Sequence, residues 1–541
     1  MALEGESPIA PGFTPAELLT PSAFAHPVTR LELRETNISW IILTGAFAYK
    51  IKKSVRLEFL DASTLALRRH LCEEELRLNR RLAADLYLDV TAITREAGVV
   101  RVGGHGQIIE YAVQMKQFEA AQELSALLDA GQVSGEEINE FAMRLAEFHA
   151  SAARAASTQD FQHTEQLHDA VLGNLATLLA HLDGGSALPD LGLLIDWTHD
   201  SLHDLLPEFR ARERCGYVRE CHGDLHAGNI VRWNGRLVPF DCLEFNPKLR
   251  WIDVMNDVAF LVMDLSARGR KDLAWSFLNA YLERSGDYDG VRLLVFYAVY
   301  RALVRAMVDS LEAQGVPEHR ERSLNRLRTR VTTAVDFVNR PPPRLFIMHG
   351  VSGSGKSWLS ERLVAQLGAV RIRSDVERKR LAGARTSGVD EPGFEQGIYT
   401  PEFSHRTYAR LLECARSCLK GGADTVIDAA FLKAADRRAF RELAVRQGVP
   451  FFIVSCEATE RILTQRITKR RQLHLDPSEA GAEVLARQSQ HLQPFDADEQ
   501  LHLITIDTTQ PDALQTTLRA IKKHLAPIKP DTRPVMPPGT I

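Results

Sequence analysis

A glycine-rich segment late in the chain has the composition of a phosphate-binding loop. It matches GxxxxGK[ST], follows an apolar stretch and precedes a segment of helical character. In such loops the backbone N–H groups turn inward around phosphate oxygens, a lysine reaches the β and γ phosphates, and a hydroxyl binds Mg²⁺. We therefore predict an ATP and Mg²⁺ site formed by Gly350, Val351, Ser352, Gly353, Ser354, Gly355, Lys356 and Ser357.

Other side chains suited to phosphoryl transfer follow this loop. Asp375 comes at the end of the second predicted strand, where a carboxylate can take a proton from an acceptor hydroxyl. Asp428 ends the third predicted strand, where it is placed to hold Mg²⁺ through water. The stretch RILTQRITKRR puts Arg466 and Arg470 four residues apart on one helical face. These cations would cover the transferred phosphoryl group, and the alternative for each arginine is a solvated basic helix face.

A second set of residues with the same kind of chemistry lies in the first half, in HGDLHAGN. Asp224 precedes Asn229 by five positions, and a short apolar run ends at Asp241. The spacing D-x-x-x-x-N is that of a kinase catalytic loop. We interpret Asp224 as the base and Asn229 and Asp241 as Mg²⁺ ligands, with His222 and His226 in structural roles.

This second site needs a lysine for the ATP phosphates and a glutamate to hold that lysine. Ala48-Tyr49-Lys50 matches the A-x-K part of a known kinase motif, and Lys52 lies on the same face of the strand. We favour Lys50 and keep Lys52 as the alternative. The glutamate is one of Glu73–Glu75, with Glu75 slightly ahead.

The adenine is expected at a hinge over Gln114, Met115 and Lys116, where backbone groups would meet the base. The first half contains no GxGxxG phosphate loop, only Thr44-Gly45 in a tight turn.

The elements that must position these residues differ between the two halves. The first half begins with short strands at 39–52, a helix at 64–83 and a strand pair at 98–104 and 107–115, and is mostly helical from 119 to 338, an α+β pattern. In the second half strands alternate with helices, which predicts an α/β P-loop fold, a parallel sheet with helices on both faces. The predicted strands are 345–350, 369–375, 424–431, 450–456 and 501–507.

Both halves resemble known kinase families. Residues 28–338 resemble the aminoglycoside phosphotransferases, which have a two-lobed protein-kinase-like fold, through HGDLHAGNI, PFDCLEF and RWIDVMNDVAF. Residues 344–526 resemble small P-loop kinases of the polynucleotide-kinase-like and gluconate-kinase- or zeta-toxin-like group, through GVSGSGKS, RIRSD, VIDAAF and RILTQRITKRR. The resemblances imply Asp224 and Asp375 as bases, although the second motif of the first half reads Asp-Cys-Leu where kinases have Asp-Phe-Gly.

These observations predict a chain with two kinase modules. The predicted parts are an N-terminal segment 1–27, a kinase-like domain 28–340 with lobes 28–118 and 119–340, a proline linker 341–343, a P-loop domain 344–526 and a disordered tail 527–541.

The charge of the chain is divided at the proline run. Residues 1–340 hold 37 Lys and Arg against 47 Asp and Glu, and residues 341–541 hold 29 against 23, so the net charges are −10 and +6. The most apolar stretch, 290–308, contains Arg292, Arg301 and Arg305, which argues against a membrane span. The sparse, odd set of cysteines and the lack of a signal peptide favour a cytoplasmic location.

We therefore expect an ATP- and Mg²⁺-dependent enzyme that phosphorylates hydroxyl groups of small molecules such as sugars or amino sugars. One alternative makes the basic P-loop half a kinase of nucleic-acid 5′-hydroxyl ends, but it lacks an aromatic-rich basic strand for stacking bases. Another makes one module a regulatory ATP-binding domain. The oligomeric state is not predicted.

Overall fold

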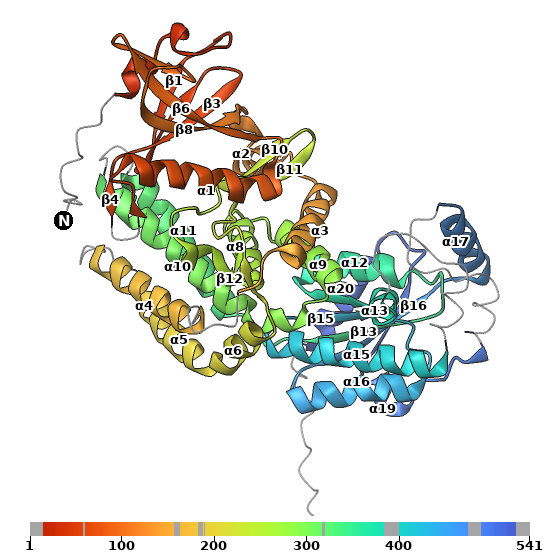
Figure 1. Cartoon of the computed structure of the whole chain (residues 1–541). Helices are drawn as coiled ribbons and strands as arrows, with labels where there is room; N and C mark the ends of the chain where they lie inside the picture. The colour runs from red at the N-terminus through yellow and green to blue at the C-terminus, as the bar shows by residue number, and fades with distance from the viewer. Residues whose placement is uncertain are drawn as a thin grey trace, which may run out of the picture. The chain divides into compact units, whose positions relative to one another are not determined.

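A computed structural model of the protein shows two compact units, Met1–Arg340 (unit 1) and Pro341–Ile541 (unit 2) (Figure 1). The structure describes residues 14–57, 60–155, 163–181, 188, 190–315, 320–383, 400–473, 488 and 490–525. The tail 527–541 lies outside the described residues.

The segment predicted as the small lobe of unit 1 (28–118) contains an antiparallel sheet with the strand order β1-β2-β3-β8-β6-β7, and helix α1 packs on one face. The elements are β1 Glu32–Glu35, β2 Ser39–Leu43, β3 Phe47–Lys52, β4 Arg56–Leu57, β5 Leu60–Asp61, α1 Leu65–Ala83, β6 Tyr87–Glu96, β7 Val99–Val102 and β8 Gln107–Lys116. The expected pairing of 98–104 with 107–115 is wrong, because β7 and β8 both pair with β6, which the sequence patterns did not reveal.

The alternation of side chains along β3 decides which of them face α1. Tyr49 and Ile51 pack on the outer face with Leu18 and Phe24, from the short 3₁₀ helices Pro15–Leu18 and Pro21–Ala23 and the residue after them. Ala48 packs on the opposite face with residues of α1. Because successive side chains of a strand point to opposite faces, the lysines at positions 50 and 52 both project toward α1.

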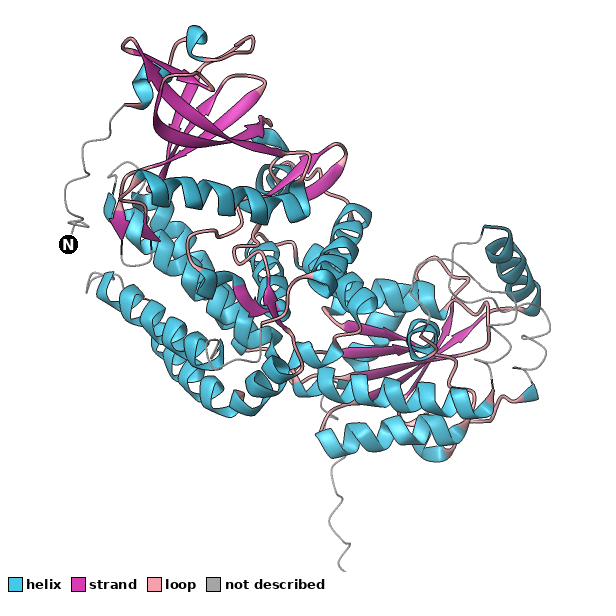
Figure 2. Ribbon diagram, in the orientation of Figure 1, coloured by secondary structure: helices cyan, strands magenta, loops and turns pink. Residues whose placement is uncertain are grey.

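The large lobe of unit 1 is helical, and its short strands frame the motif loops (Figure 2). The HGDLHAGN segment connects β9 to β10, and Asp241 follows β11. The strands are β9 Val218–Glu220, β10 Ile230–Trp233, β11 Arg236–Pro239 and β12 Trp251–Asp253. The helices are α2 Leu124–Asp129, α3 Gly135–Ser151, α4 His163–His181, α5 Leu191–Asp204, α6 Leu206–Arg214, α7 Pro247–Arg250, α8 Val254–Ala267, α9 Lys271–Ser285, α10 Val291–Gly315 and α11 Arg320–Val338.

Unit 2 is a parallel sheet with the strand order β14-β15-β13-β16-β17, as the sequence predicts. Helices α12 and α20 cover one face and α15 and α16 the other (Figures 1 and 2). The strands are β13 Leu345–His349, β14 Val370–Arg373, β15 Thr425–Asp428, β16 Phe451–Glu457 and β17 Leu503–Asp507. The helices are α12 Lys356–Leu367, α13 Ser374–Leu381, α15 Pro401–Lys420, α16 Ala434–Gln447, α17 Glu460–Leu473, α19 Ala497–Gln500 and α20 Ala513–Leu525.

Within the described residues, no helix combines the length and the apolar character that a membrane crossing requires.

Candidate functional site

The two lysines of β3 share one glutamate of α1. Lys50 Nζ donates to Glu75 Oε1 at 3.0 Å and also to Asp241 of the large lobe. Lys52 Nζ donates to the other oxygen of Glu75 and to Glu244. Of the three glutamates that the sequence offered, the structure places Glu75 in this role, because it is fully buried on the face of α1 that meets the sheet.

The charges in this cluster hold one another ionised. Burial alone would lower the pKa of Lys50, but the carboxylates of Asp241, Glu75 and Glu244 outweigh it and hold its pKa well above the usual value. Burial alone would raise the pKa of Glu75, but Lys50 and Lys52 lower it to about 2. For Glu244 burial prevails over Lys52, and its pKa is raised. The lysine that contacts Asp241 is therefore a permanent cation at the large-lobe motif.

The residues predicted to form the catalytic loop lie together in the large lobe. Asn229 Nδ2 donates to the main-chain oxygen of Asp224 at 3.1 Å and to its Oδ2 at 2.9 Å. His226 Nε2 lies 3.5 Å from the same carboxylate oxygen. Burial raises the pKa of Asp224, but His226 and Arg305 outweigh it and hold the pKa well below the usual value. Asp224 is therefore ionised at neutral pH, as a proton acceptor must be.

Two aspartates of α8 hold this loop from beneath. Asp257 accepts hydrogen bonds from the backbone N–H groups of His222 (2.8 Å) and Gly223 (2.9 Å). Asp264 accepts from the N–H of Ala227 at 3.0 Å. Because both carboxylates are buried and bind backbone, they fix the path of the loop on either side of Asp224.

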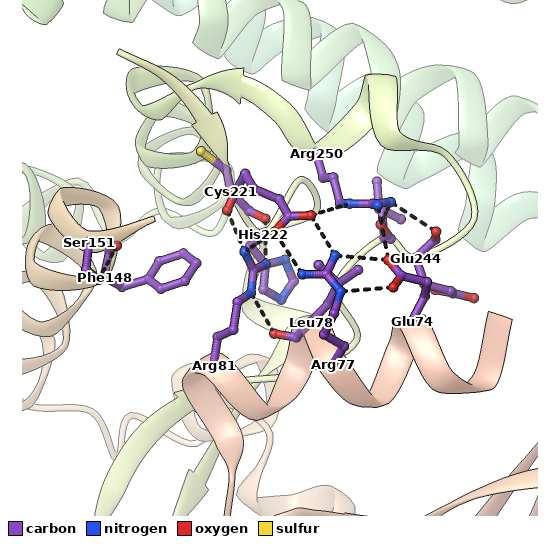
Figure 3. Close-up of polar contacts among 12 residues, drawn as sticks. Glu74, Arg77, Leu78, Arg81, Phe148, Ser151, Cys221, His222, Glu244 and Arg250 are labelled. Atoms are coloured by element: carbon purple, nitrogen blue, oxygen red, sulfur yellow. Dashed lines mark hydrogen bonds and ion pairs between the residues drawn. The ribbon is translucent and has the colours of Figure 1, made fainter. Parts of the chain in front are cut away.

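A cluster of charged residues joins α1 to the strand before the catalytic loop. Glu220, which is buried, accepts from Arg77 at 2.7 Å, from Arg81 at 3.1 Å and from Arg250 at 3.2 Å. Figure 3 shows Arg81 of α1 reaching the backbone of Cys221, and Arg77 and Arg250 both reaching Glu74. We call Glu74, Arg77, Arg81, Glu220 and Arg250 the Glu220 cluster. It ties the helix that carries Glu75 to the segment that leads to Asp224.

Asp241 has a backbone conformation that few residues adopt. Its φ angle is 62°, in the left-handed region that aspartate tolerates better than most L-residues. Its N–H donates to the hydroxyl of Tyr87 at 3.1 Å, and the N–H of the next residue, Cys242, donates to Asn79 of α1 at 3.0 Å. The turn after β11 is therefore held by the small lobe, and the Asp241 carboxylate is directed at Lys50.

The predicted hinge residues and the Thr44-Gly45 turn lie at the same end of the sheet in the small lobe. Gln114 and Met115 lie inside β8, paired with Tyr49 and Ala48, and β8 ends at Lys116, the last residue of the predicted hinge. The Thr44-Gly45 turn lies beside this end of β8, where the Gly45 N–H donates to the side chain of Gln117 at 2.8 Å. The turn beside the lysine end of β3 is instead 36–38, because the Lys53 N–H donates to the Ile38 carbonyl at 2.9 Å.

In unit 2 the predicted phosphate loop connects β13 to α12. Gly353 has a φ of 82° and Gly355 a φ of 93°, both disfavoured for residues with a Cβ. A Cβ on Gly353 would also lie 2.9 Å from the carbonyl oxygen of Leu463, and one on Gly355 would lie 2.7 Å from Thr508 Oγ1. The loop therefore needs glycine both for its turn and for its close contact with α17 and with the residue after β17.

One pocket of ≈ 250 Å³ gathers most of the residues predicted for unit 2. Asp428 ends β15 as expected, and its Oδ2 accepts from Ser360 Oγ at 3.2 Å. Asp375 lies in the first turn of α13 rather than at the end of β14, a shift of two residues. The predicted residues that line the pocket are Ser352, Gly353, Gly355, Lys356, Ser357, Asp375, Asp428 and Arg466.

The two arginines of α17 have different outcomes. Arg466 Nη1 donates to the Gly353 carbonyl at 3.2 Å and to Thr508 Oγ1 at 2.9 Å, so it contacts the phosphate loop directly. The backbone of Arg470 belongs to α17, but its side chain lies outside the described part of the structure.

Several residues at the two sites were not found from the sequence. In unit 2 the Ser352 N–H donates to Gln488 Oε1 at 2.7 Å, and Thr508 bonds the Ser354 carbonyl at 2.7 Å. In unit 1 Arg305 of α10 approaches His226 and Asp224. These residues lie far along the chain from the motifs they contact, and no spacing rule connects them.

The chain is similar to several known proteins. A protein-family model described as an AAA domain matches residues 345–495. The chain is 32% identical over 476 residues to the uncharacterized protein Rv2004c of Mycobacterium tuberculosis, which covers 86% of this chain and 92% of the relative.

Solved structures with partial similarity include two kinases. A choline/ethanolamine kinase family protein from Mesorhizobium loti covers 58% of this chain and 89% of its own at 11% identity, with a TM-score of 0.35. A sugar kinase from Janibacter sp. covers 34% of this chain and 94% of its own at 22% identity, with a TM-score of 0.26.

Proposed function

This chain belongs to the same family as the mycobacterial protein Rv2004c, and we propose that it is an ATP- and Mg²⁺-dependent phosphotransferase with two kinase modules. Each module would transfer the γ-phosphoryl group of ATP to a hydroxyl group of a small molecule, such as a sugar, an amino sugar or a related metabolite. A P-loop domain in unit 2 and the kinase-like constellation in unit 1 support the proposal.

The observation that carries the proposal is the double contact of Lys50. One ammonium group bridges Glu75 of α1 and Asp241 of the large lobe, which lie 25 and 191 residues away in the sequence. A bridge of this kind is what holds a lysine where it can meet ATP phosphates beside a metal-binding aspartate. The Asp241 side chain is 42% exposed, so a metal ion can reach it, which a purely structural aspartate would not need.

The donor groups present in unit 1 fit a magnesium ion. The amide nitrogen of Asn229 is used by Asp224, so its oxygen remains for a cation, and Asp241 supplies a carboxylate. Oxygen ligands of this kind are the ones Mg²⁺ prefers. Asn229 and Asp241 would hold the ion in unit 1, and Ser357 and Asp428 in unit 2. When bound, the ion neutralises charge on the phosphates of ATP.

The protein groups divide the remaining work. In unit 1 Asp224 takes the proton of the acceptor hydroxyl. The hydroxyl oxygen forms a bond to the γ-phosphorus of ATP, and the bond from that phosphorus to the oxygen of the leaving ADP breaks. In unit 2 Asp375 has the same task, while Lys356 and Arg466 offset negative charge on the phosphates. Both bases act only when ionised, and Asp224 meets that condition at neutral pH.

A screen of ATP consumption tests the proposal. Full-length wild type, Asp224→Asn and Lys356→Ala are compared with sugars, amino sugars, nucleosides and 5′-hydroxyl oligonucleotides as acceptors. We expect Asp224→Asn to lower transfer to one group of acceptors by about 10²–10⁴-fold and Lys356→Ala to lower transfer to another.

Two substitutions at exposed residues away from both sites serve as controls. Asp272→Ala, at an exposed carboxylate of unit 1, and Lys522→Ala, in the last turn of α20, should leave both rates unchanged. Unchanged product spectra in both site variants would contradict the proposal. Lys356-dependent transfer to the oligonucleotide alone would favour a nucleic-acid end as the acceptor of unit 2.

A further inference from the structure

Beside the catalytic base of unit 1 lies a cation, Arg305, that forms no ion pair within 4 Å among the described residues. Arg305 is partly buried on α10, and its positive charge lowers the pKa of Asp224. Its guanidinium lies against a histidine, with Nη1 at 3.5 Å from His226 Nε2. If His226 Nε2 can accept a hydrogen bond, Arg305 has a partner there; if it cannot, the Nη1 donor has none at this contact.

The His226 contact cannot be a hydrogen bond of Arg305. The backbone N–H of Gly228 donates to His226 Nδ1 at 3.0 Å, so Nδ1 carries a lone pair. A histidine that accepts at Nδ1 carries its hydrogen on Nε2, and this hydrogen faces Asp224 Oδ2 at 3.5 Å. Nε2 is then a donor, and Arg305 Nη1, which is also a donor, finds no acceptor there.

A second observation concerns the other nitrogen of Arg305. Its Nε is buried and has no hydrogen-bond partner among the described residues. One turn earlier on α10, Arg301 Nε donates to Asn256 at 2.7 Å, and one turn later Asp309 Oδ1 accepts from Arg326 at 2.6 Å, while Asp309 Oδ2 is buried without a hydrogen-bond partner among the described residues. A buried unpaired donor on a guanidinium costs free energy, and an acceptor group from outside the chain would offset that cost at Arg305 Nε.

We propose that Arg305 binds an oxyanionic group, a carboxylate or a phosphate, on the acceptor that unit 1 phosphorylates. This inference rests on the proposed function of unit 1 and gives the chemical class of its substrate. Arginine suits such a group because its planar fork of N–H donors matches two oxygens at once. Arg305 lies at Asp224 and shows no contact with Lys50 or Asp241 among the described residues, which places it with the acceptor rather than with ATP.

The net charge of unit 1 points to the opposite class of acceptor. A charge of −10 over residues 1–340 favours a cationic or neutral substrate. The local charge beside Asp224 is positive instead, from Arg305. Short-range contacts decide which group fits a site, because charges further away than about 8–10 Å are screened at physiological salt.

Binding of small oxyanions tests the inference without knowledge of the whole acceptor. The full chain with Lys356→Ala and saturating non-hydrolysable ATP analogue is titrated with inorganic phosphate and, separately, with acetate. We expect one of these anions to bind, and Arg305→Gln to weaken that binding by about 10- to 100-fold. Binding of phosphate would indicate a phosphate group on the acceptor, and binding of acetate would indicate a carboxylate. Arg292→Ala, from the same helix, should have no effect.

Transfer assays test the role of Arg305 separately from the proposed function of unit 1. Glucose, glucosamine, glucuronate and glucose 6-phosphate are supplied as hydroxyl acceptors to the same proteins. We expect a higher kcat/KM for one of the two anionic sugars, and loss of this preference in Arg305→Gln. Unchanged anion binding in Arg305→Gln, or an equal loss of rate with all four sugars, would overturn the role of Arg305. Transfer that does not depend on Asp224 would instead overturn the proposed function of unit 1.

Discussion

Unit 1 holds its site with ion pairs between distant segments, whereas unit 2 builds most of its site from one loop. In unit 1 the contacts of Lys50 and Lys52 join residues 23 to 192 positions apart. In unit 2 Ser352 to Ser357 are consecutive, and their shape comes from glycine conformations.

The difference predicts different weaknesses. Buried ion pairs are costly to break, because the remaining partner is left charged and without water. A glycine loop loses its shape through backbone strain instead. Variants at charged residues should therefore act on both stability and activity in unit 1, and the two lysines of β3 allow these effects to be separated.

The largest expected effect separates Lys50 from Lys52. Lys52→Met leaves the buried Glu244 without its cation and should destabilise unit 1 by about 3–5 kcal/mol. Lys50→Met leaves a half-exposed Asp241, and Glu75 keeps Lys52, so stability should change less while phosphoryl transfer falls by about 10²-fold or more. Urea unfolding and transfer rates measure the two quantities.

A double variant checks the cause of the Lys52 effect. Lys52→Met combined with Glu244→Leu removes both partners, and most of the lost stability should return, because no unpaired charge remains. A double variant as unstable as Lys52→Met would show that the lysine stabilises the lobe through packing rather than through its charge.

A smaller effect is expected at the Glu220 cluster. Glu220→Gln leaves Arg77, Arg81 and Arg250 around a neutral amide and should cost about 3 kcal/mol, with a lower kcat, because α1 loses its tie to the catalytic loop (Figure 3). Glu73→Gln is the matched control on α1, since Glu73 pairs only with the exposed Arg69 and should change stability by less than about 1 kcal/mol. Equal effects of the two substitutions would remove the cluster's proposed role.

Motif spacing predicted the site residues that are close together in the sequence. The loop Gly350–Ser357, the pair Asp224 and Asn229, and the strand that ends at Asp428 follow from local rules, because a short segment determines its own turn. The parallel sheet of unit 2 was also predicted, since buried strands alternate with helices.

The remaining residues depend on contacts that no local rule describes. Arg305 lies 79 positions from His226, and in the sequence alone it stands out only as a charge in an apolar stretch. Thr508 and Gln488 reach the phosphate loop from 154 and 136 positions away. Strand β6 was not predicted for a related reason. Its mixed polar pattern does not identify it as a strand, and its place in the sheet is evident only from its pairing with β7 and β8.

The smallest expected effect concerns a neutral histidine beneath the phosphate loop of unit 2. Burial, and then the cations of Arg437 and Lys356, lower the pKa of His349 to about 4. Its pKa in the unfolded chain is about 6.5, so between these values the unfolded state binds more protons and stability rises with pH. As the pH falls from 7 to 5, unit 2 should lose about 2 kcal/mol of stability through this residue.

Hydrogen exchange of peptides that cover β13, measured at pH 7 and pH 5 and corrected for intrinsic rates, reports this change. His349→Gln keeps a polar side chain near Ser455 but does not titrate, so its pH dependence should be flatter by the same amount. Lys356→Ala removes one cation and should reduce the dependence only in part, because burial is the larger cause. If His349→Gln has the same slope as wild type, the protons are taken up elsewhere, and His349 is not the residue that makes unit 2 sensitive to pH.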